Sequence, residues 1–180
     1  EFIIFVDGDD WVDETYIEKL VLSLQKESAD MSICGWIREN IYGEISSSSK
    51  YCYKILDKKE AIYCSLKPDG FQGYLWNKLF KRKIIEKYEL TFDSNITIFE
   101  DLLFVIKYLA YCHKIVVDFF PLYHYVNHDN SARQNSLLNN NFNQKWLTEI
   151  EAMTQIINIL DDKNLKNYAK SKKALSCGFY

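Results

Sequence analysis

The sequence predicts an α/β fold in which a mixed sheet is flanked by helices and followed by a helical C-terminal extension. An apolar run at residues 2–6 ends in an acidic turn and is followed by the apolar stripe of an amphipathic helix, which is the order of an α/β unit. Further strand-like runs then alternate with helical patterns. From residue 139 onward only helical periodicity remains, so we expect two regions, 1–135 and 136–180.

The composition is that of a globular protein. The 180 residues are 48% hydrophobic and 26% charged, with only 6 Gly and 2 Pro, which excludes disordered and collagen-like chains. A net charge of -3 provides no basic field for nucleic acid, and no apolar run approaches the ~18 residues that cross a membrane. The 5 cysteines form no C-x-x-C pair, which favours reduced, buried thiols over a zinc ribbon or a disulfide framework.

The first α/β unit is expected at the start of the chain. Residues 2–6, Phe-Ile-Ile-Phe-Val, have the pattern of a strand buried on both faces, as in a parallel sheet covered by helices. Asp13 is a candidate cap for the helix that follows. The apolar residues of that helix recur with a period of 3.6 residues and are Tyr16, Ile17, Leu20, Val21 and Leu24.

Two more strands are expected at residues 31–37 and 51–55, separated by a polar, exposed loop with four consecutive serines. The spacing of Asp57 and Glu60 fits a capping box and predicts a short helix over residues 61–66.

Another helix is expected to begin at Glu100 and Asp101 and to present an apolar side as far as residue 110. A strand at residues 114–118 follows, and we expect it to end before Pro121 because proline cannot donate to a sheet ladder. The C-terminal extension is predicted to be helical at residues 146–160 and 165–175.

Three carboxylates in four positions follow the first strand: Asp7, Asp9 and Asp10. Like charges this close repel each other strongly at a partly buried site unless a cation or hydrogen-bond donors compensate. Open α/β sheets bind ligands outside the carboxyl ends of their strands, and carboxylate oxygens suit Mg²⁺ or Mn²⁺ bridging a diphosphate. The alternative is an Asp-rich turn that only caps a helix.

Two other features are candidates for chemistry. Glu100 and Asp101 stand at a helix N-terminus, which favours an ionised carboxylate, as a general base requires; the alternative is a helix cap. His128 is a candidate ligand for a metal or a phosphate, and the alternative is a loop histidine with neither role.

In their order and spacing, four segments resemble the family-2 glycosyltransferases of GT-A fold. They are Phe-Val-Asp-Gly-Asp-Asp-Trp at residues 5–11, Trp-Asn-Lys-Leu-Phe-Lys-Arg-Lys-Ile-Ile at 76–85, Phe-Glu-Asp-Leu-Leu-Phe at 99–104 and Leu-Tyr-His-Tyr-Val-Asn-His-Asp-Asn-Ser at 122–131. The match covers residues 1–135 and implies part of a GT-A domain with a Rossmann-like mixed sheet.

The resemblance implies roles on the donor side and for the base. Asp7 and Asp9 would form the D-x-D motif that holds Mn²⁺ or Mg²⁺ and the diphosphate of a nucleotide-sugar, with Asp9 as the direct ligand and Asp10 beside the sugar or the metal shell. Asp101 would be the base of an inverting transfer, with Glu100 positioning the acceptor.

On the acceptor side, the resemblance implies that Trp76, Asn77 and Lys78 belong to the segment that binds the acceptor. His128 matches a position that meets the metal or the diphosphate in relatives. One departure is Val126, which stands where relatives commonly have Arg.

In such enzymes a nucleobase-binding half, with a P-x-Y-N-like segment and a D-D-G-S-like turn, precedes the D-x-D strand. Neither pattern occurs in these residues, so we expect the chain to be the C-terminal part of a glycosyltransferase and to be inactive alone. The implied partners are a nucleotide-sugar donor and a saccharide or lipid-linked saccharide acceptor. We expect a cytoplasmic site of action in a bacterial cell, with any membrane association made by parts outside these residues.

Two other functions stay open from the residues. A haloacid-dehalogenase-like phosphatase also has a strand that ends in D-x-D, but Trp11 stands where that family has Thr or Val. A non-catalytic interaction or scaffold module would use the helical C-terminal region instead. Dependence on both Mn²⁺ and a nucleoside diphosphate would separate the transferase from these two.

Overall fold

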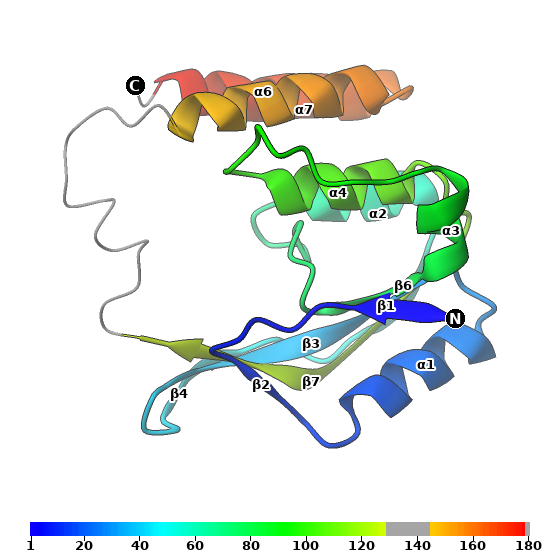
Figure 1. The fold of residues 1–180 in the computed structure, drawn as a ribbon, viewed down its shortest axis with the longest axis vertical. Coiled ribbons are helices and arrows are strands. Elements are labelled where there is room, and N and C mark those ends of the chain that lie inside the picture. The colour runs from blue at the N-terminus through cyan, green and yellow to red at the C-terminus, as the bar shows by residue number, and fades with distance from the viewer. Residues whose placement is uncertain (129–144, 179–180) are drawn as a thin grey trace.

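A mixed sheet of seven strands separates the helices into layers (Figure 1). The computed structural model describes residues 1–128 and 145–178. The strands are β1 (Phe2–Ile4), β2 (Trp11–Val12), β3 (Met31–Asn40), β4 (Ile45–Ser48), β5 (Tyr53–Leu56), β6 (Lys78–Lys81) and β7 (Ile115–Asn127). The helices are α1 (Tyr16–Lys26), α2 (Lys58–Leu66), α3 (Arg82–Lys87), α4 (Glu100–Leu109), α6 (Lys145–Ile159) and α7 (Lys163–Gly178).

The strand order is β1-β6-β3-β7-β2, with β4 paired to β3 and β5 paired to β7. β3 and β7 run parallel, and the other pairs are antiparallel. Helix α1 covers one face of the sheet, α2 and α4 cover the other, and α6 and α7 form a further layer outside them (Figure 1). One apolar core lies beneath α1, and a larger one extends from the sheet through α2 and α4 to α6 and α7.

The expectation of a first strand buried on both faces is wrong. β1 is an edge strand that ends at Ile4, and β6 is its only strand partner within residues 1–128 and 145–178. Its residues are half-buried, and Val6 is 48% exposed. The strand is apolar because Phe2 and Ile4 pack on the α1 side while Phe5, just after it, packs with the core beneath α4.

Helix α1 begins two residues later than a cap at Asp13 would place it. Asp13 Oδ1 accepts hydrogen bonds from Thr15 N (2.8 Å) and Thr15 Oγ1 (2.6 Å), so it stabilises the turn before the helix, and Thr15 takes the N-cap position. Ile17, expected on the apolar stripe, is exposed. The stripe that is buried against the sheet consists of Tyr16, Leu20 and Leu24.

The predicted end of the last strand before Pro121 is also wrong, because β7 continues to Asn127. The ladder between β3 and β7 shifts register on either side of Gly35, which is paired with Pro121, and this irregularity accommodates a residue without an N–H. A Cβ at Gly35 would lie 2.6 Å from the carbonyl oxygen of Phe119, so only glycine allows this close approach.

The other predicted elements form with small changes of length, whereas β2, β6 and α3 were not predicted. The capping box between Asp57 and Glu60 is present in both directions, and α2 begins at Lys58, directly after the N-cap Asp57 and three residues before the predicted start. The serine-rich loop is exposed as expected, but it also contains β4, whose four residues are all exposed and therefore show no buried periodicity. Both C-terminal helices form where they were predicted.

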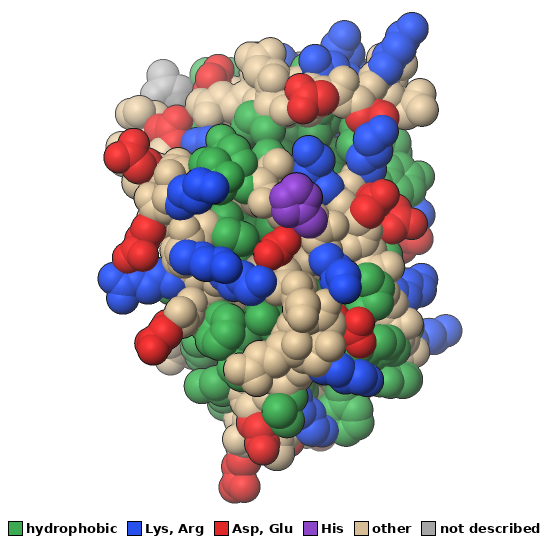
Figure 2. All heavy atoms as spheres, turned by 90° about the vertical axis from the view of Figure 1, so that its right-hand side faces the viewer, with side chains coloured by type: hydrophobic (Ala, Val, Ile, Leu, Met, Phe, Trp, Pro, Cys, Tyr) green, Lys and Arg blue, Asp and Glu red, His purple; other side chains and the backbone are tan. Residues whose placement is uncertain are grey.

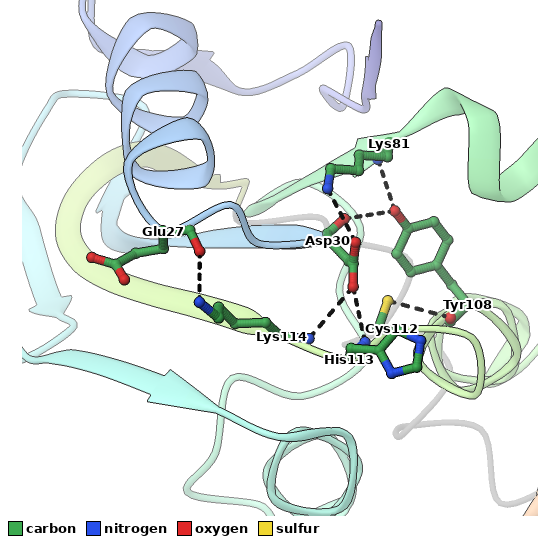
Figure 3. A network of polar contacts seen from close by, with 7 residues as sticks. All are labelled: Glu27, Asp30, Lys81, Tyr108, Cys112, His113 and Lys114. Atoms are coloured by element: carbon green, nitrogen blue, oxygen red, sulfur yellow. Dashed lines mark hydrogen bonds and ion pairs between the residues drawn. The ribbon is translucent and has the colours of Figure 1, made fainter.

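The end of the sheet where β3 begins is held by a polar network around Asp30 (Figure 3). The Asp30 carboxylate accepts hydrogen bonds from Lys81 Nζ (3.0 Å), His113 N (2.9 Å) and Lys114 N (3.4 Å). The Tyr108 hydroxyl donates to the Asp30 carbonyl oxygen at 2.8 Å. These contacts join β3, β6, α4 and the start of β7.

The described residues contain no helix that is both long and apolar enough to span a bilayer. Figure 2 shows the face at the right of Figure 1, where Lys and Arg side chains are interspersed with Asp and Glu, so this face carries no extended patch of one charge.

Candidate active site

The acidic turn after β1 is fastened to β7 through Asp10. Asp10 Oδ1 accepts a hydrogen bond from Val126 N (2.8 Å), and Oδ2 accepts one from the Tyr123 hydroxyl (2.7 Å). The Tyr123 oxygen in turn accepts a hydrogen bond from Asp7 N at 3.1 Å. Asp10 therefore shapes the turn, and the carboxylates of Asp7 and Asp9 remain for a ligand.

The continuation of β7 beyond Pro121 brings His128 to the acidic turn. His128 Nε2 lies 3.9 Å from Asp9 Oδ2, and both side chains are about half exposed or more, at 46% and 66%. The fold thus brings together the first and last of the matched motifs. Residues 129–131 of the last motif lie outside the described residues.

The electrostatics of the turn match the repulsion expected from its sequence. Burial raises the pKa of the Asp7 carboxyl, and the charges of Asp10 and Asp9 raise it further. Burial also raises the pKa of Asp10, although its hydrogen bonds from Val126 and Tyr123 act in the opposite direction. A divalent cation would relieve this cost.

Within the described part of the chain, no group of three or more His, Cys, Asp or Glu side chains is arranged to hold a metal ion. The carboxylates of Asp7 and Asp9 are nevertheless the ligand type that a cation of the Mg²⁺ class prefers, and His128 lies 3.9 Å from Asp9. Such cations are usually held by one or two carboxylates together with substrate phosphates and water, so a complete protein cage is not required.

The Glu100 and Asp101 pair begins α4, as predicted, and lines a pocket of about 350 Å³. Burial raises the pKa of Asp101 to about 6, and the nearby charges of Glu100 and Asp7 also raise it, while Lys78 acts in the opposite direction. The influence of Asp7 means that the candidate base and the acidic turn belong to one electrostatic site.

The structure buries the Trp76–Lys78 segment. Lys78 is fully buried, and its ammonium donates hydrogen bonds to Tyr74 O (2.6 Å), Asn77 Oδ1 (2.8 Å) and Phe71 O (3.4 Å). Burial lowers the pKa of Lys78 to about 7. Asn77 is 1% exposed. In this arrangement the side chains of Asn77 and Lys78 are out of reach of a bound acceptor.

Trp76 instead forms the centre of an aromatic stack. Its ring stacks on Tyr74 with a centroid distance of 4.9 Å and on Tyr123 with one of 4.5 Å. Tyr74 lines the same pocket as Asp101, and Tyr123 binds Asp10. The stack therefore connects the two halves of the site.

Sequence reasoning missed Tyr74 and Tyr123 as parts of the site. It also missed the contacts of Trp11, whose ring stacks on His124 at 3.4 Å and whose indole N–H donates to the buried carboxylate of Glu39. If the last strand had been expected to continue through Pro121, the alternation of its side chains between the two faces of the sheet would have indicated Tyr123 as a site residue. Tyr74 stacks on Trp76, only two residues away, whereas nothing local to Glu39 indicates its contact with Trp11, which lies in a distant segment.

Comparison with known proteins agrees with the geometry. Residues 1–89 match the family model described as Glycosyl transferase family 2. The chain is 29% identical over 137 residues to the putative glycosyltransferase EpsH of Bacillus subtilis (strain 168), covering 74% of this chain and 40% of EpsH. It is 28% identical over 111 residues to the uncharacterized glycosyltransferase EpsJ of the same organism, covering 56% of this chain and 30% of EpsJ. The chain thus spans less than half the length of these relatives.

The fold is similar to that of S. aureus TarS. The crystal structure of TarS 1-349 in complex with UDP-GlcNAc superposes with a TM-score of 0.63 at 16% identity, covering 94% of this chain and 45% of that one. The structure of S. aureus TarS matches with a TM-score of 0.57 at 16% identity, covering 98% of this chain and 39% of that one. The predicted fold class, a mixed α/β sheet of GT-A type with flanking helices, is confirmed.

Proposed function

We propose that this protein is a family-2 glycosyltransferase, the family whose model residues 1–89 match, and that it transfers a sugar from a nucleotide-sugar donor to a saccharide or lipid-linked saccharide acceptor. The transfer inverts the anomeric configuration and depends on a divalent cation. Support comes from the similarity to EpsH and EpsJ and from the UDP-GlcNAc complex of the structurally similar TarS.

The observation that carries the proposal is the electrostatic influence of Asp7, in the acidic turn, on Asp101 in its pocket. Asp101 lines a pocket at the start of α4, its pKa is raised to about 6, and Asp7 contributes to that shift. A carboxylate with this pKa is ionised at neutral pH and is a better proton acceptor than an ordinary aspartate. The charge of Asp7 also links this carboxylate electrostatically to the turn where a diphosphate would leave.

On the donor side, Asp9, Asp7 and His128 are the residues that would hold Mn²⁺ or Mg²⁺. The bound cation supplies charge that stabilises the departing nucleoside diphosphate. Asp10 keeps the turn in place through its hydrogen bonds to Tyr123 and Val126.

On the acceptor side, Asp101 removes the proton from the attacking hydroxyl, and Glu100 beside it orients the acceptor. We assign Trp76, Asn77 and Lys78 an indirect part in acceptor binding. Lys78 fixes the carbonyl groups of residues 71 and 74, and Trp76 supports Tyr74 in the pocket wall.

A titration of the full-length protein with Mn²⁺ and UDP, followed by calorimetry and thermal melting, tests this function. We expect Mn²⁺ to tighten UDP binding and the two ligands together to raise the melting temperature, since both bind only the folded state. A phosphatase would instead form an aspartyl-phosphate from a phosphomonoester, and a scaffold module would respond to neither ligand. UDP binding that is indifferent to Mn²⁺ would contradict the proposed donor site.

A further inference from the structure

The segment that leads into Asp101 is held by the two C-terminal helices. Thr148 of α6 accepts hydrogen bonds at its Oγ1 from the backbone N–H groups of Ile98 (3.1 Å) and Thr97 (3.3 Å). Lys172 of α7 places its ammonium 5.5 Å from the centre of the Phe99 ring. The same ammonium donates a hydrogen bond to the carbonyl oxygen of Leu66 at 2.8 Å, which ties α7 to the end of α2.

The backbone at Phe99 needs such support. Phe99 precedes α4 with φ 67° and ψ 17°, a left-handed conformation that is unfavourable for a bulky residue. It lacks a side-chain cap, and its carbonyl oxygen accepts the first helical hydrogen bond, from Leu103 N (2.9 Å). Strained conformations of this kind persist only where the surrounding structure imposes them.

Lys172 also belongs to the wall of the pocket that Asp101 lines. The other pocket residues come from the loop of residues 72–74, from the segment 97–99 and from the ends of α2 and α4. The C-terminal region is therefore part of the site that holds the candidate base, and it does more than cover the outer face of α4.

We propose that Thr148 and Lys172 are positioning residues, which fix the segment 97–99 so that Asp101 points into the acceptor pocket. Because it takes Asp101 as the base, this role rests on the proposed function. The basis is geometric: Thr148 of α6 contacts Thr97 and Ile98, and Lys172 of α7 contacts Phe99, so the two helices together hold the three residues that precede Glu100.

The test compares substitutions that remove the contact with substitutions that keep it. Thr148→Val removes the acceptor oxygen at nearly constant shape, and Thr148→Ser retains it. Lys172→Met removes the ammonium but keeps a long apolar stem, and Lys172→Arg keeps a cation. Lys173→Met is the matched control, because the Lys173 ammonium donates its hydrogen bond to Thr154 Oγ1 (2.6 Å) on α6 and not to residues 97–99.

Steady-state kinetics and melting curves of the full-length protein provide the readout. We expect Thr148→Val and Lys172→Met to lower kcat by about 10- to 100-fold, the loss typical of a slightly misplaced catalytic group, while KM for UDP-GlcNAc or another accepted donor stays near wild type. Thr148→Ser and Lys172→Arg should restore most of kcat, and Lys173→Met should match wild type.

Unchanged kcat in both Thr148→Val and Lys172→Met would overturn the positioning role. So would a loss that Lys173→Met shares, or one that follows the melting temperature, since either indicates a general contribution to folding. If Thr148→Val does not fold, the Lys172→Met and Lys172→Arg pair decides alone. Asp101→Asn, assayed in parallel, separates failure of the proposed base from failure of the positioning role. Normal turnover in Asp101→Asn refutes the base itself. Normal turnover in Lys172→Met, together with an inactive Asp101→Asn, refutes only the positioning role.

Discussion

Asp101 is the residue at which a catalytic role and a merely structural role in the first turn of α4 give opposite expectations. If Asp101 is the base, Asp101→Asn should lower kcat by about 10²- to 10⁴-fold, because an amide cannot accept the acceptor proton. Donor binding and the melting temperature should change little, since Asp101 is the second residue of α4 and the N-cap position belongs to Phe99, so the substitution removes no cap. Enzyme kinetics combined with thermal melting measures both quantities.

The pH dependence of wild-type kcat provides an independent check on the result for Asp101→Asn. Burial raises the pKa of Asp101 to about 6, so wild-type kcat should fall as the pH drops through about 6, where the base becomes protonated. An aspartate with the ordinary pKa of about 4 would keep the enzyme active to lower pH. Near-normal kcat in Asp101→Asn would transfer the role to Glu100.

Asp9 is expected to act on the donor side only. Asp9→Asn should abolish transfer and remove the Mn²⁺ dependence of UDP binding, because a neutral amide is a weaker ligand for a hard cation. Its side chain is 66% exposed, so the melting temperature without ligands should stay near wild type. Calorimetric titration checks the metal dependence. Glu86→Gln on α3 removes another exposed carboxylate, 58% exposed, and should leave binding unchanged.

Among the secondary-structure elements, β3 has its start held in place by the carboxylate of one residue, Asp30. Burial by itself would raise the pKa of Asp30, but hydrogen bonds from His113 N–H and Lys81 outweigh it and hold the pKa below its ordinary value. Asp30→Asn places an amide among these donors and should cost about 2–4 kcal/mol of unfolding free energy. Chemical denaturation measures the loss, and Asp57→Asn, at an exposed N-cap, should cost only a few tenths of a kcal/mol.

The pH dependence of that loss has a definite sign. Because the folded pKa of Asp30 is depressed, its carboxylate stabilises the fold above the unfolded pKa of about 4, and this contribution disappears as the pH falls through the folded value. The stabilities of wild type and Asp30→Asn should therefore converge in acid. A difference that stays constant down to low pH would mean that the charge of Asp30 is not the cause.

The elements that the sequence predicted well are those whose signals are local. The capping box at Asp57 and the acidic start of α4 at Glu100 depend on neighbours within one turn of helix. The end of β7 could not be predicted, because the cost of Pro121 is removed by Gly35 on another strand. β4 was missed because an exposed strand has no apolar period.

In the candidate site, too, residues with local signals were predicted and contacts between distant segments were not. Asp7, Asp9 and Asp101 were predicted as site residues from their places at a strand end and a helix start, and their roles stay predictions. The stack of Tyr74, Trp76 and Tyr123 was not predicted, since Tyr123 on β7 is far along the chain from the segment that supplies the other two rings. The acceptor role of Lys78 was inferred from its segment alone, and burial could only be seen once β6 was placed inside the sheet.

For the whole molecule, the question is whether the C-terminal helices form a separate region. The division at residue 135 remains a prediction, yet α6 and α7 contribute to the same apolar core as α2 and α4. The buried residues that these helices and the turn between them supply are Ala152, Met153, Ile156, Leu160, Leu165 and Ala169. A core shared in this way couples the helices to α4, and so to the start of the helix where Asp101 lies.

Two substitutions on α6 test this coupling. Met153 is fully buried, so Met153→Ala should cost about 2–5 kcal/mol and lower the melting temperature of the whole fold in one cooperative transition. Leu147 is 49% exposed on the same helix, and Leu147→Ala should stay within about 0.5 kcal/mol of wild type. Calorimetry of the full-length protein distinguishes a shared fold from an independent C-terminal region. If the region were independent, it would melt in Met153→Ala as a separate, earlier transition. The transition that contains the sheet and α4 would then keep its wild-type temperature.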